Sequence, residues 1–156
     1  MQRLSTSRTG PGRRKTSRGF TLIETMIVVG IVAVLSSIAY PSLEAQVLRA
    51  RRTDGLIALM QAQLAQERHR ANNRTYGDLT EIGLRATSMS GYYTLQVNSS
   101  SVDGYEVVAT ATGRQARDTG CQTLRLAAYG ASLGYASGPN ASASNPADVN
   151  RRCWNQ

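Results

Sequence analysis

The amino-acid sequence predicts an α+β protein in which one long N-terminal helix packs against an antiparallel sheet of three to four strands. Two observations lead to this prediction. An apolar stretch, uncharged except for Glu24, continues into a segment whose apolar residues recur every three or four positions, as in a helix with one buried face. Beyond it, β-rich runs follow one another between turn signals, which is typical of a meander laid across a helix.

The first nineteen residues form a basic leader. They hold six of the eighteen basic residues and no acid, so the net charge of +8 falls to +2 for residues 20–156. The leader is rich in Ser, Thr, Arg and Gly, and we expect residues 1–18 to build no core and residues 1–19 to be removable. A basic segment ahead of an apolar one stays in the cytoplasm during insertion, which predicts that the rest of the chain faces outward.

Residues 20–43 are predicted to form an apolar half-helix that spans a membrane. At 1.5 Å per residue, such a stretch is about 36 Å long, which is enough to cross a bilayer. Gly30 and Pro41 interrupt it, and we expect a kink at these positions without an end to the helix. Glu24 is anomalous here, because a carboxylate in a membrane segment is costly and persists mostly where it finds a partner.

Residues 44–72 are predicted to form an amphipathic half-helix that continues the first and packs along a soluble domain. Arg52 and Gln66 are among the polar residues expected on its other faces, and Asn72-Asn73 is the expected stop. The expected stripe consists of Leu48, Leu56, Leu59, Met60 and the position Gln63/Leu64.

The sheet is predicted within residues 90–156 of a globular domain that covers residues 44–156. Asp103-Gly104 is a hairpin turn signal between two of the strands. Residues 138–150, rich in Ala, Ser and Asn, are expected to form a surface loop. The expected strands are residues 92–97, 105–110, 123–127 and a short one at 133–136.

The two cysteines and the absence of catalytic motifs from the sequence limit the classes of function that this chain can have. Cys121 and Cys153 fit a single disulfide in an oxidising compartment, and a catalytic dithiol would need closer spacing. The sequence has one histidine, no clustered metal ligands and no Gly-rich phosphate loop. We therefore expect no enzyme, no cofactor and no metal site.

The stretch Arg18-Gly19-Phe20-Thr21-Leu22-Ile23-Glu24 resembles the type IV prepilin signature closely. Together with the apolar half-helix, the sheet and the cysteine pair, it makes the chain similar to type IV pilins. Runs further along the chain resemble the minor-pilin-like PilE group in particular. These runs are Gly91-Tyr92-Tyr93-Thr94, Thr110-Ala111-Thr112-Gly113, Asp118-Thr119-Gly120-Cys121 and Cys153-Trp154.

The resemblance implies roles at the N-terminus. A prepilin peptidase would cut after Gly19 and methylate the new amine of Phe20. Glu24 would pair with that amine on a neighbouring subunit as the filament grows, since an amine and a carboxylate in apolar surroundings gain most by meeting each other. The implied partners are other pilin subunits, the peptidase and the inner-membrane assembly machinery. The chain would lie in the inner membrane with its globular domain in the periplasm, and later in an extracellular pilus.

Other interpretations of the N-terminus explain less of the sequence. An ordinary secretory signal peptide would be cleaved near Ser37-Ile38-Ala39 or after Ala45, but Glu24 and the amphipathic continuation argue against it. A twin-arginine signal at Arg13-Arg14 lacks the expected following residues, and a plain anchor leaves Glu24 without a reason. We favour a minor pilin that joins or primes a filament for adhesion, twitching motility or DNA uptake. A type II secretion pseudopilin is the first alternative.

The second alternative is a DNA receptor displayed on the pilus. Five arginines near the cysteines could gather on one face and bind phosphate bidentately. Given a charge of only +2 for residues 20–156, we favour a solvated or subunit-contacting surface in which they meet acids such as Asp118 and Asp148. The candidate DNA contacts are Arg114, Arg117, Arg125, Arg151 and Arg152.

Overall fold

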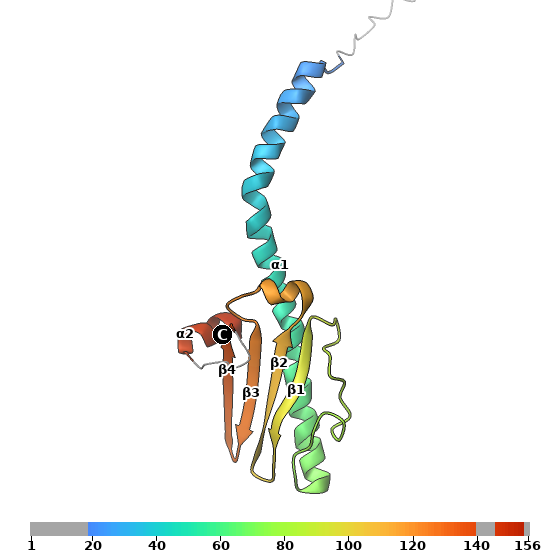
Figure 1. Ribbon diagram of the computed structural model, residues 1–156, viewed down its shortest axis with the longest axis vertical. Helices are drawn as coiled ribbons and strands as arrows, with labels where there is room; N and C mark the ends of the chain where they lie inside the picture. The colour runs from blue at the N-terminus through green and yellow to red at the C-terminus, as the bar shows by residue number, and fades with distance from the viewer. Residues whose placement is uncertain (1–18, 140–145, 155–156) are drawn as a thin grey trace, which may run out of the picture. The chain divides into compact units, whose positions relative to one another are not determined.

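The computed structural model describes residues 19–139 and 146–154 (Figure 1). Residues 1–18 of the predicted basic leader, which covers residues 1–19, lie outside the described residues. The chain divides into two compact units, with the boundary between Ala39 and Tyr40. The elements in chain order are α1 (Leu22–Asn73), β1 (Tyr93–Ser100), β2 (Gly104–Ala111), the 3-10 helix η1 (Gly113–Arg117), β3 (Thr123–Tyr129), β4 (Ser132–Gly138) and α2 (Ala147–Cys153).

In the first unit, α1 begins with a capping box that the sequence analysis missed. The amide of Glu24 donates to Thr21 Oγ1 at 3.3 Å, and the amide of Thr21 donates to Glu24 Oε2 at 3.5 Å. Each side chain thus satisfies a backbone donor that a helix start leaves unpaired. An 18-residue window of α1 has a mean hydropathy of 2.3 and no buried part, so this helix is long and apolar enough to cross a membrane. Gly30 and Pro41 lie within α1 and do not end it; a kink there stays a prediction.

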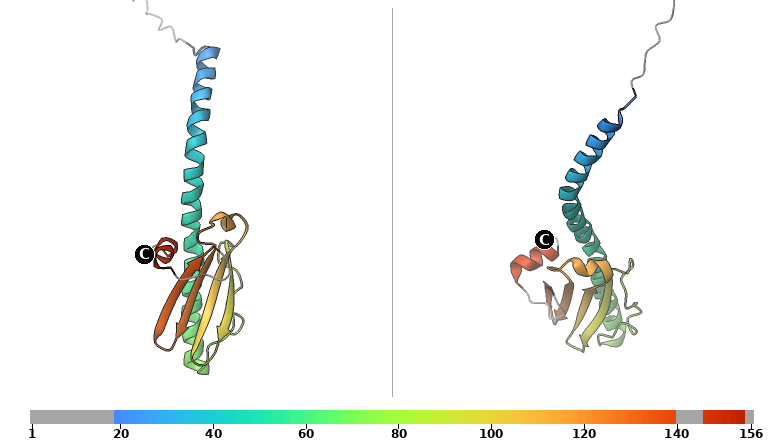
Figure 2. Two further views of the ribbon diagram at one scale, coloured as in Figure 1. Left: turned by 60° about the vertical axis from the view of Figure 1, so that its left-hand side comes forward. Right: turned by 45° about the horizontal axis from the view of Figure 1, so that its top comes forward.

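The second unit combines α1 with a four-stranded antiparallel sheet in the order β1-β2-β3-β4. The views in Figure 2 show the later turns of α1 running along one face of this sheet. The predicted α+β class and the consecutive antiparallel pairing are confirmed. Each strand alternates its side chains between the two faces, so that Leu95, Val107 and Leu126 all belong to the buried core.

The buried face of α1 differs from the predicted stripe. Leu56 and Leu59 enter the core as expected, but Met60 and Leu64 are 57% and 62% exposed. Arg52 and Gln66, which we expected on polar faces, are buried instead. The reason is the helical period: the face toward the sheet runs from position 52 through 55, 59 and 62 to 66, and its two polar members find partners in the fold. Gln66 exchanges hydrogen bonds with the backbone of Gly77.

Gly55 sets how closely α1 approaches the sheet. A Cβ atom at this position would lie 2.9 Å from the ring of Tyr93, closer than real Cβ atoms come to their neighbours. Glycine inside a helix costs about 1 kcal/mol relative to alanine. Here that cost is offset because the bare backbone lets Tyr93 pack flat against the helix with no exposed surface.

The C-terminal segment contains a short helix where we predicted only a loop. Residues 147–150 of the expected 138–150 loop belong to α2. Asp148 in the first turn and Arg151 and Arg152 in the last turn suit the helix dipole, and Asn150 bonds Ser137 Oγ and the carbonyl of Tyr135. Cys153 at the end of α2 is bonded to Cys121, with a Cα–Cα distance of 5.5 Å. The disulfide is confirmed, and closing a loop of this length contributes about 4 kcal/mol in the chain-entropy model.

Asp54 of α1 holds the loop that precedes β1. Its carboxylate accepts hydrogen bonds from the hydroxyl of Ser88 and, at 3.0 Å, from the amide of Ser90. Burial alone would raise the pKa of Asp54, but these hydrogen bonds outweigh it and lower the pKa below the ordinary value of 3.8. The ionised carboxylate therefore stabilises the folded state.

We predict that Asp54→Asn lowers the free energy of unfolding at neutral pH by about 1 kcal/mol, because a charged acceptor is replaced by a neutral one. The folded-state pKa lies below the unfolded-state pKa, so the contribution is present above the unfolded pKa and is lost as the pH falls through the folded pKa. Urea unfolding of the two proteins between about pH 6 and about pH 2 should therefore converge at the acid end. A difference that persists unchanged at the acid end would contradict this prediction.

Candidate nucleic-acid interface

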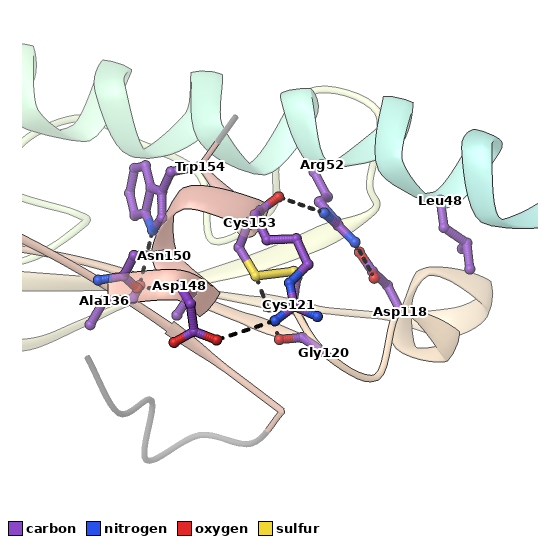
Figure 3. Close-up of a disulfide and its surroundings, with 12 residues drawn as sticks. Leu48, Arg52, Asp118, Gly120, Cys121, Ala136, Asp148, Asn150, Cys153 and Trp154 are labelled. Carbon is purple, nitrogen blue, oxygen red and sulfur yellow. Dashed lines mark hydrogen bonds and ion pairs between the residues drawn. A yellow bond between two sulfur atoms is a disulfide. The ribbon is translucent and has the colours of Figure 1, made fainter. Parts of the chain in front are cut away.

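A buried ion pair joins three segments of the second unit. The guanidinium of Arg52 on α1 donates twice to Asp118, through Nε and, at 2.6 Å, through Nη2. Its Nη1 donates to the carbonyl of Arg152 in α2 at 3.0 Å. Both charged side chains are less than a tenth exposed. Figure 3 shows these bonds beside the Cys121–Cys153 disulfide, so that a covalent link and an ion pair fasten the same region.

Gln115 of η1 extends this polar cluster into the core. It is fully buried, and its Nε2 donates to the carbonyl of Leu48 at 3.0 Å and to the hydroxyl of Tyr93 at 3.2 Å. Burial raises the pKa of Tyr93 to about 12, the hydrogen bond with Gln115 offsets part of that rise, and the charge of Asp118 adds to it. Tyr93 therefore stays a neutral phenol, and the cluster holds only the compensated charges of Arg52 and Asp118.

A groove of about 470 Å³ opens above the ion pair. It is bounded by α1, by the loop that runs from η1 to β3, and by α2, and Cys121 of the disulfide is part of its wall. We call it the disulfide groove. Four arginines from these three segments line it, namely Arg49, Arg52, Arg117 and Arg152.

A second hollow of about 240 Å³ also contains Leu48 in its wall. It is lined by α1 residues and by Arg114 of η1. Arg51 borders it as well, and its guanidinium lies 4.7 Å from the ring centroid of Tyr92. The two hollows thus place arginines of α1, η1 and α2 around Leu48.

These arginines collect the positive charge of the protein in one region, which we call the arginine end. Its seven arginines stand against three acids, a balance of +4, whereas the rest of residues 20–156 has five arginines and seven acids, a balance of −2. Six of its arginines line the two hollows, namely Arg49, Arg51, Arg52, Arg114, Arg117 and Arg152, and the seventh, Arg151, is the neighbour of Arg152 in α2. Its acids are Glu44 and Asp118, which line the hollows, and Asp148, the ion-pair partner of Arg152.

The structure brings four of the five predicted contact arginines together and leaves one apart. Arg114, Arg117, Arg151 and Arg152 belong to the arginine end, and all four are exposed. Arg125 lies on β3, forms an ion pair with Glu106 of β2 at 3.4 Å, and lines a different hollow with two tyrosines.

Sequence reasoning missed the contribution of α1. Arg49, Arg51 and Arg52 form a compact basic run just where the helix becomes amphipathic. We had assigned them only to the polar faces of the helix. Such a run, next to arginines predicted to lie near the disulfide, is the signal that could have found them.

The predicted processing residues lie at the start of the first unit. Gly19 and Phe20 precede α1, and the side chain of Phe20 is 83% exposed. Among the described residues, no group of three or more His, Cys, Asp or Glu side chains could hold a metal ion.

In this chain a long helix begins with an apolar half, and its second half packs on an antiparallel meander. A disulfide closes the C-terminal region. This is the architecture of a type IV pilin. The sequence matches two family models in succession. "Prokaryotic N-terminal methylation motif" covers residues 14–40, and "Type IV minor pilin ComP, DNA uptake sequence receptor" covers residues 41–125. The chain therefore belongs to the family of the type IV minor pilin ComP.

Individual relatives come from pili and from secretion systems. The type IV wide pilus major component PilA4 of Thermus thermophilus is 32% identical over 103 residues, which cover 64% of this chain and 77% of the relative. The type II secretion system core protein G of Klebsiella michiganensis is 34% identical over 74 residues, 47% of this chain and 51% of its own. The prepilin peptidase-dependent protein D of Escherichia coli is 51% identical over 39 residues, about a quarter of each chain (25% and 27%).

We predict that Arg52→Ala lowers the free energy of unfolding of the second unit by about 3–5 kcal/mol, because it leaves the carboxylate of Asp118 buried without its partner. The double variant Arg52→Met/Asp118→Leu removes both charges and should recover most of that loss. Chemical unfolding of the unit Tyr40–Gln156 measures both effects. A double variant as unstable as the single one would show that the ion pair does not act as described.

Proposed function

We propose that this minor pilin binds DNA through its arginine end while it is displayed on a type IV pilus. The observation that carries the proposal is the segregation of charge, with +4 gathered at one region of a chain that belongs to the ComP family. Arginine forks bind phosphate oxygens bidentately, and a local excess of cations captures DNA in a salt-dependent way. The arginine end suits the DNA uptake receptor that the family description names.

The family match changes the preference that the sequence alone suggested. The sequence favoured a passive surface in which the arginines meet acids, and two exposed pairs of this kind exist at the arginine end, Arg117 with Glu44 and Arg152 with Asp148. Both pairs are exposed, however, and exposed ion pairs are weak enough to be exchanged for a ligand. The number of arginines at this end exceeds the number of acids, and with the family match we favour the DNA receptor.

A pseudopilin role is the second candidate. It is supported by the 34% identity to the secretion system core protein G, which extends over 74 residues. The minor-pilin family model covers residues 41–125 and thus includes β1, β2, the whole connection to β3 and the first three residues of β3. We therefore prefer a pilus subunit, with binding and structural roles and without catalysis.

For assembly, we propose that prepilin peptidase cleaves between Gly19 and Phe20 and methylates the amine of Phe20. Residues 20–43 would then lie in the inner membrane, with residues 44–156 in the periplasm. Glu24 would pair with the amine of a neighbouring Phe20 in the filament, where other pilins surround residues 20–43. The exposed apolar side chains of α1 support this, since 22 large hydrophobic residues are exposed in the part of the chain that the structure describes and most of them belong to α1.

We predict that Glu24→Ala leaves membrane insertion intact and sharply reduces incorporation into pili, because the neighbouring amine loses its partner. Immunoblots of sheared pili and of membranes measure the two effects, with Glu24→Asp as the matched control that keeps the charge. N-terminal analysis of the wild type should find methylated Phe20. Normal incorporation of Glu24→Ala, or a mature start at Tyr40 or Gln46, would contradict the assignment.

We predict that residues 20–156, without the basic leader, bind duplex DNA with low-micromolar affinity or better at about 0.15 M salt. The leader is left out because its own basic residues would attract DNA. Arg151→Ala/Arg152→Ala should weaken binding and lower the dependence of affinity on salt, because phosphate contacts are lost. Fluorescence anisotropy in a non-ionic detergent provides the measurement.

The matched control for this pair is Arg68→Ala/Arg85→Ala, which removes the same charge from exposed arginines outside the arginine end. The control should bind DNA nearly as well as the wild type. If both double variants lose the same affinity, the binding follows net charge alone and the arginine end is no interface.

A further inference from the structure

Contacts within the protein hold the shape of the disulfide groove. Its three walls belong to separate segments of the chain, and the Cys121–Cys153 bond and the contacts of Arg52 with Asp118 and Arg152 hold them together. The backbone segments that carry the groove arginines are therefore held in place before any ligand arrives. Preorganisation of this kind reduces the entropy that binding must overcome.

Two of the charged side chains that line the groove, Arg52 and Asp118, pair with each other within the protein. The guanidinium of Arg52 is buried and donates hydrogen bonds to Asp118 and to the carbonyl of Arg152. Asp118 in turn accepts from Arg52 and from Gln115. Arg52 and Asp118 thus form the floor of the groove and add no net charge to it.

The remaining three arginines of the groove are exposed and differ in their partners. Arg117 Nη1 lies 2.9 Å from Glu44 Oε1, and Arg152 Nη2 lies 3.5 Å from Asp148 Oδ2. Arg49 has no ion pair within the described part of the chain. Side chains of the two pairs are between 39% and 67% exposed, so water and ions reach both.

We propose that the disulfide groove holds one backbone phosphate of DNA, and that Glu44 and Asp148 compete with this phosphate for the groove arginines. The inference rests on the proposed function and deepens it. Three guanidinium groups from different segments border one small volume, which suits the two free oxygens of a phosphodiester. A base edge is read by a side chain that enters the major groove of the duplex, whereas these three guanidinium groups border one hollow of the protein surface. The groove therefore contributes affinity and not sequence preference.

The first arm of the test removes the phosphate contact. Arg49→Gln/Arg117→Gln, in residues 20–156, should lower the slope of log affinity against log salt by about 0.9 and the affinity by about fivefold near 0.15 M salt. The affinity ratio for two duplexes of equal composition and different sequence should not change. The matched control, Arg68→Gln/Arg85→Gln, should leave the affinity nearly unchanged.

The second arm removes the competing acids. Glu44→Gln and Asp148→Asn should each raise the affinity for DNA, by up to about fivefold, because an exposed ion pair no longer has to be broken. Asp103→Asn is the matched control, since Asp103 is exposed in the turn before β2, at the opposite strand end from η1. A gain that Asp103→Asn reproduces would overturn the competition, because it would report net charge alone.

The outcomes separate this inference from the proposed function. If the wild-type chain binds DNA but the groove variant behaves like its control, the phosphate assignment is wrong and the receptor function stands. A groove variant that loses sequence preference would also overturn the assignment, in favour of base readout. If the wild-type chain does not bind DNA, both the receptor function and the groove assignment fall.

Discussion

The ion pair between Arg52 and Asp118 is the interaction on which the rest of the globular unit depends. It lies where α1, the loop after η1 and α2 meet, and each of these segments contributes a donor or an acceptor to it. Removing two charges from water is costly, and their attraction repays the cost only when every remaining polar atom is satisfied. The amide of Gln115 and the carbonyl of Arg152 supply those additional partners. Together with the disulfide, the pair therefore specifies one arrangement of these three segments.

This arrangement explains how a chain with little net charge acquires a strongly basic region. The sheet, the loop before β1 and the end of α1 carry the compensating acids, while the arginines of α1, η1 and α2 meet around Leu48. The net charge of the whole chain does not reveal this uneven distribution of charge. The relevant quantity for a polyanion is the local electrostatic potential, which is screened over about 8 Å at physiological salt.

Much of the fold follows from sequence, because it depends on patterns that repeat. Apolar length identifies the first half of α1, and β-rich runs with turn signals identify the strands. The prediction of the buried face of α1 was partly wrong, since Met60 is exposed and Arg52 is buried. Hydrophobicity predicts burial only on average. Arg52 is buried because it forms an ion pair with Asp118, which lies 66 residues further along the chain. The helical turns of α2 were missed because their partners, Ser137 and Tyr135, lie on β4. No local window contains such long-range partners.

The Cys121–Cys153 bond also has a mechanical consequence. The two residues are 32 positions apart, and an extended chain of that length would measure roughly 110 Å. Tension applied to α2 cannot draw out this length, because the force passes through the sulfur atoms directly to the start of β3. The strands β3 and β4 lie inside this closed loop and are thereby shielded from such a load. The disulfide thus protects two of the four strands from a force on α2 without any addition to the core.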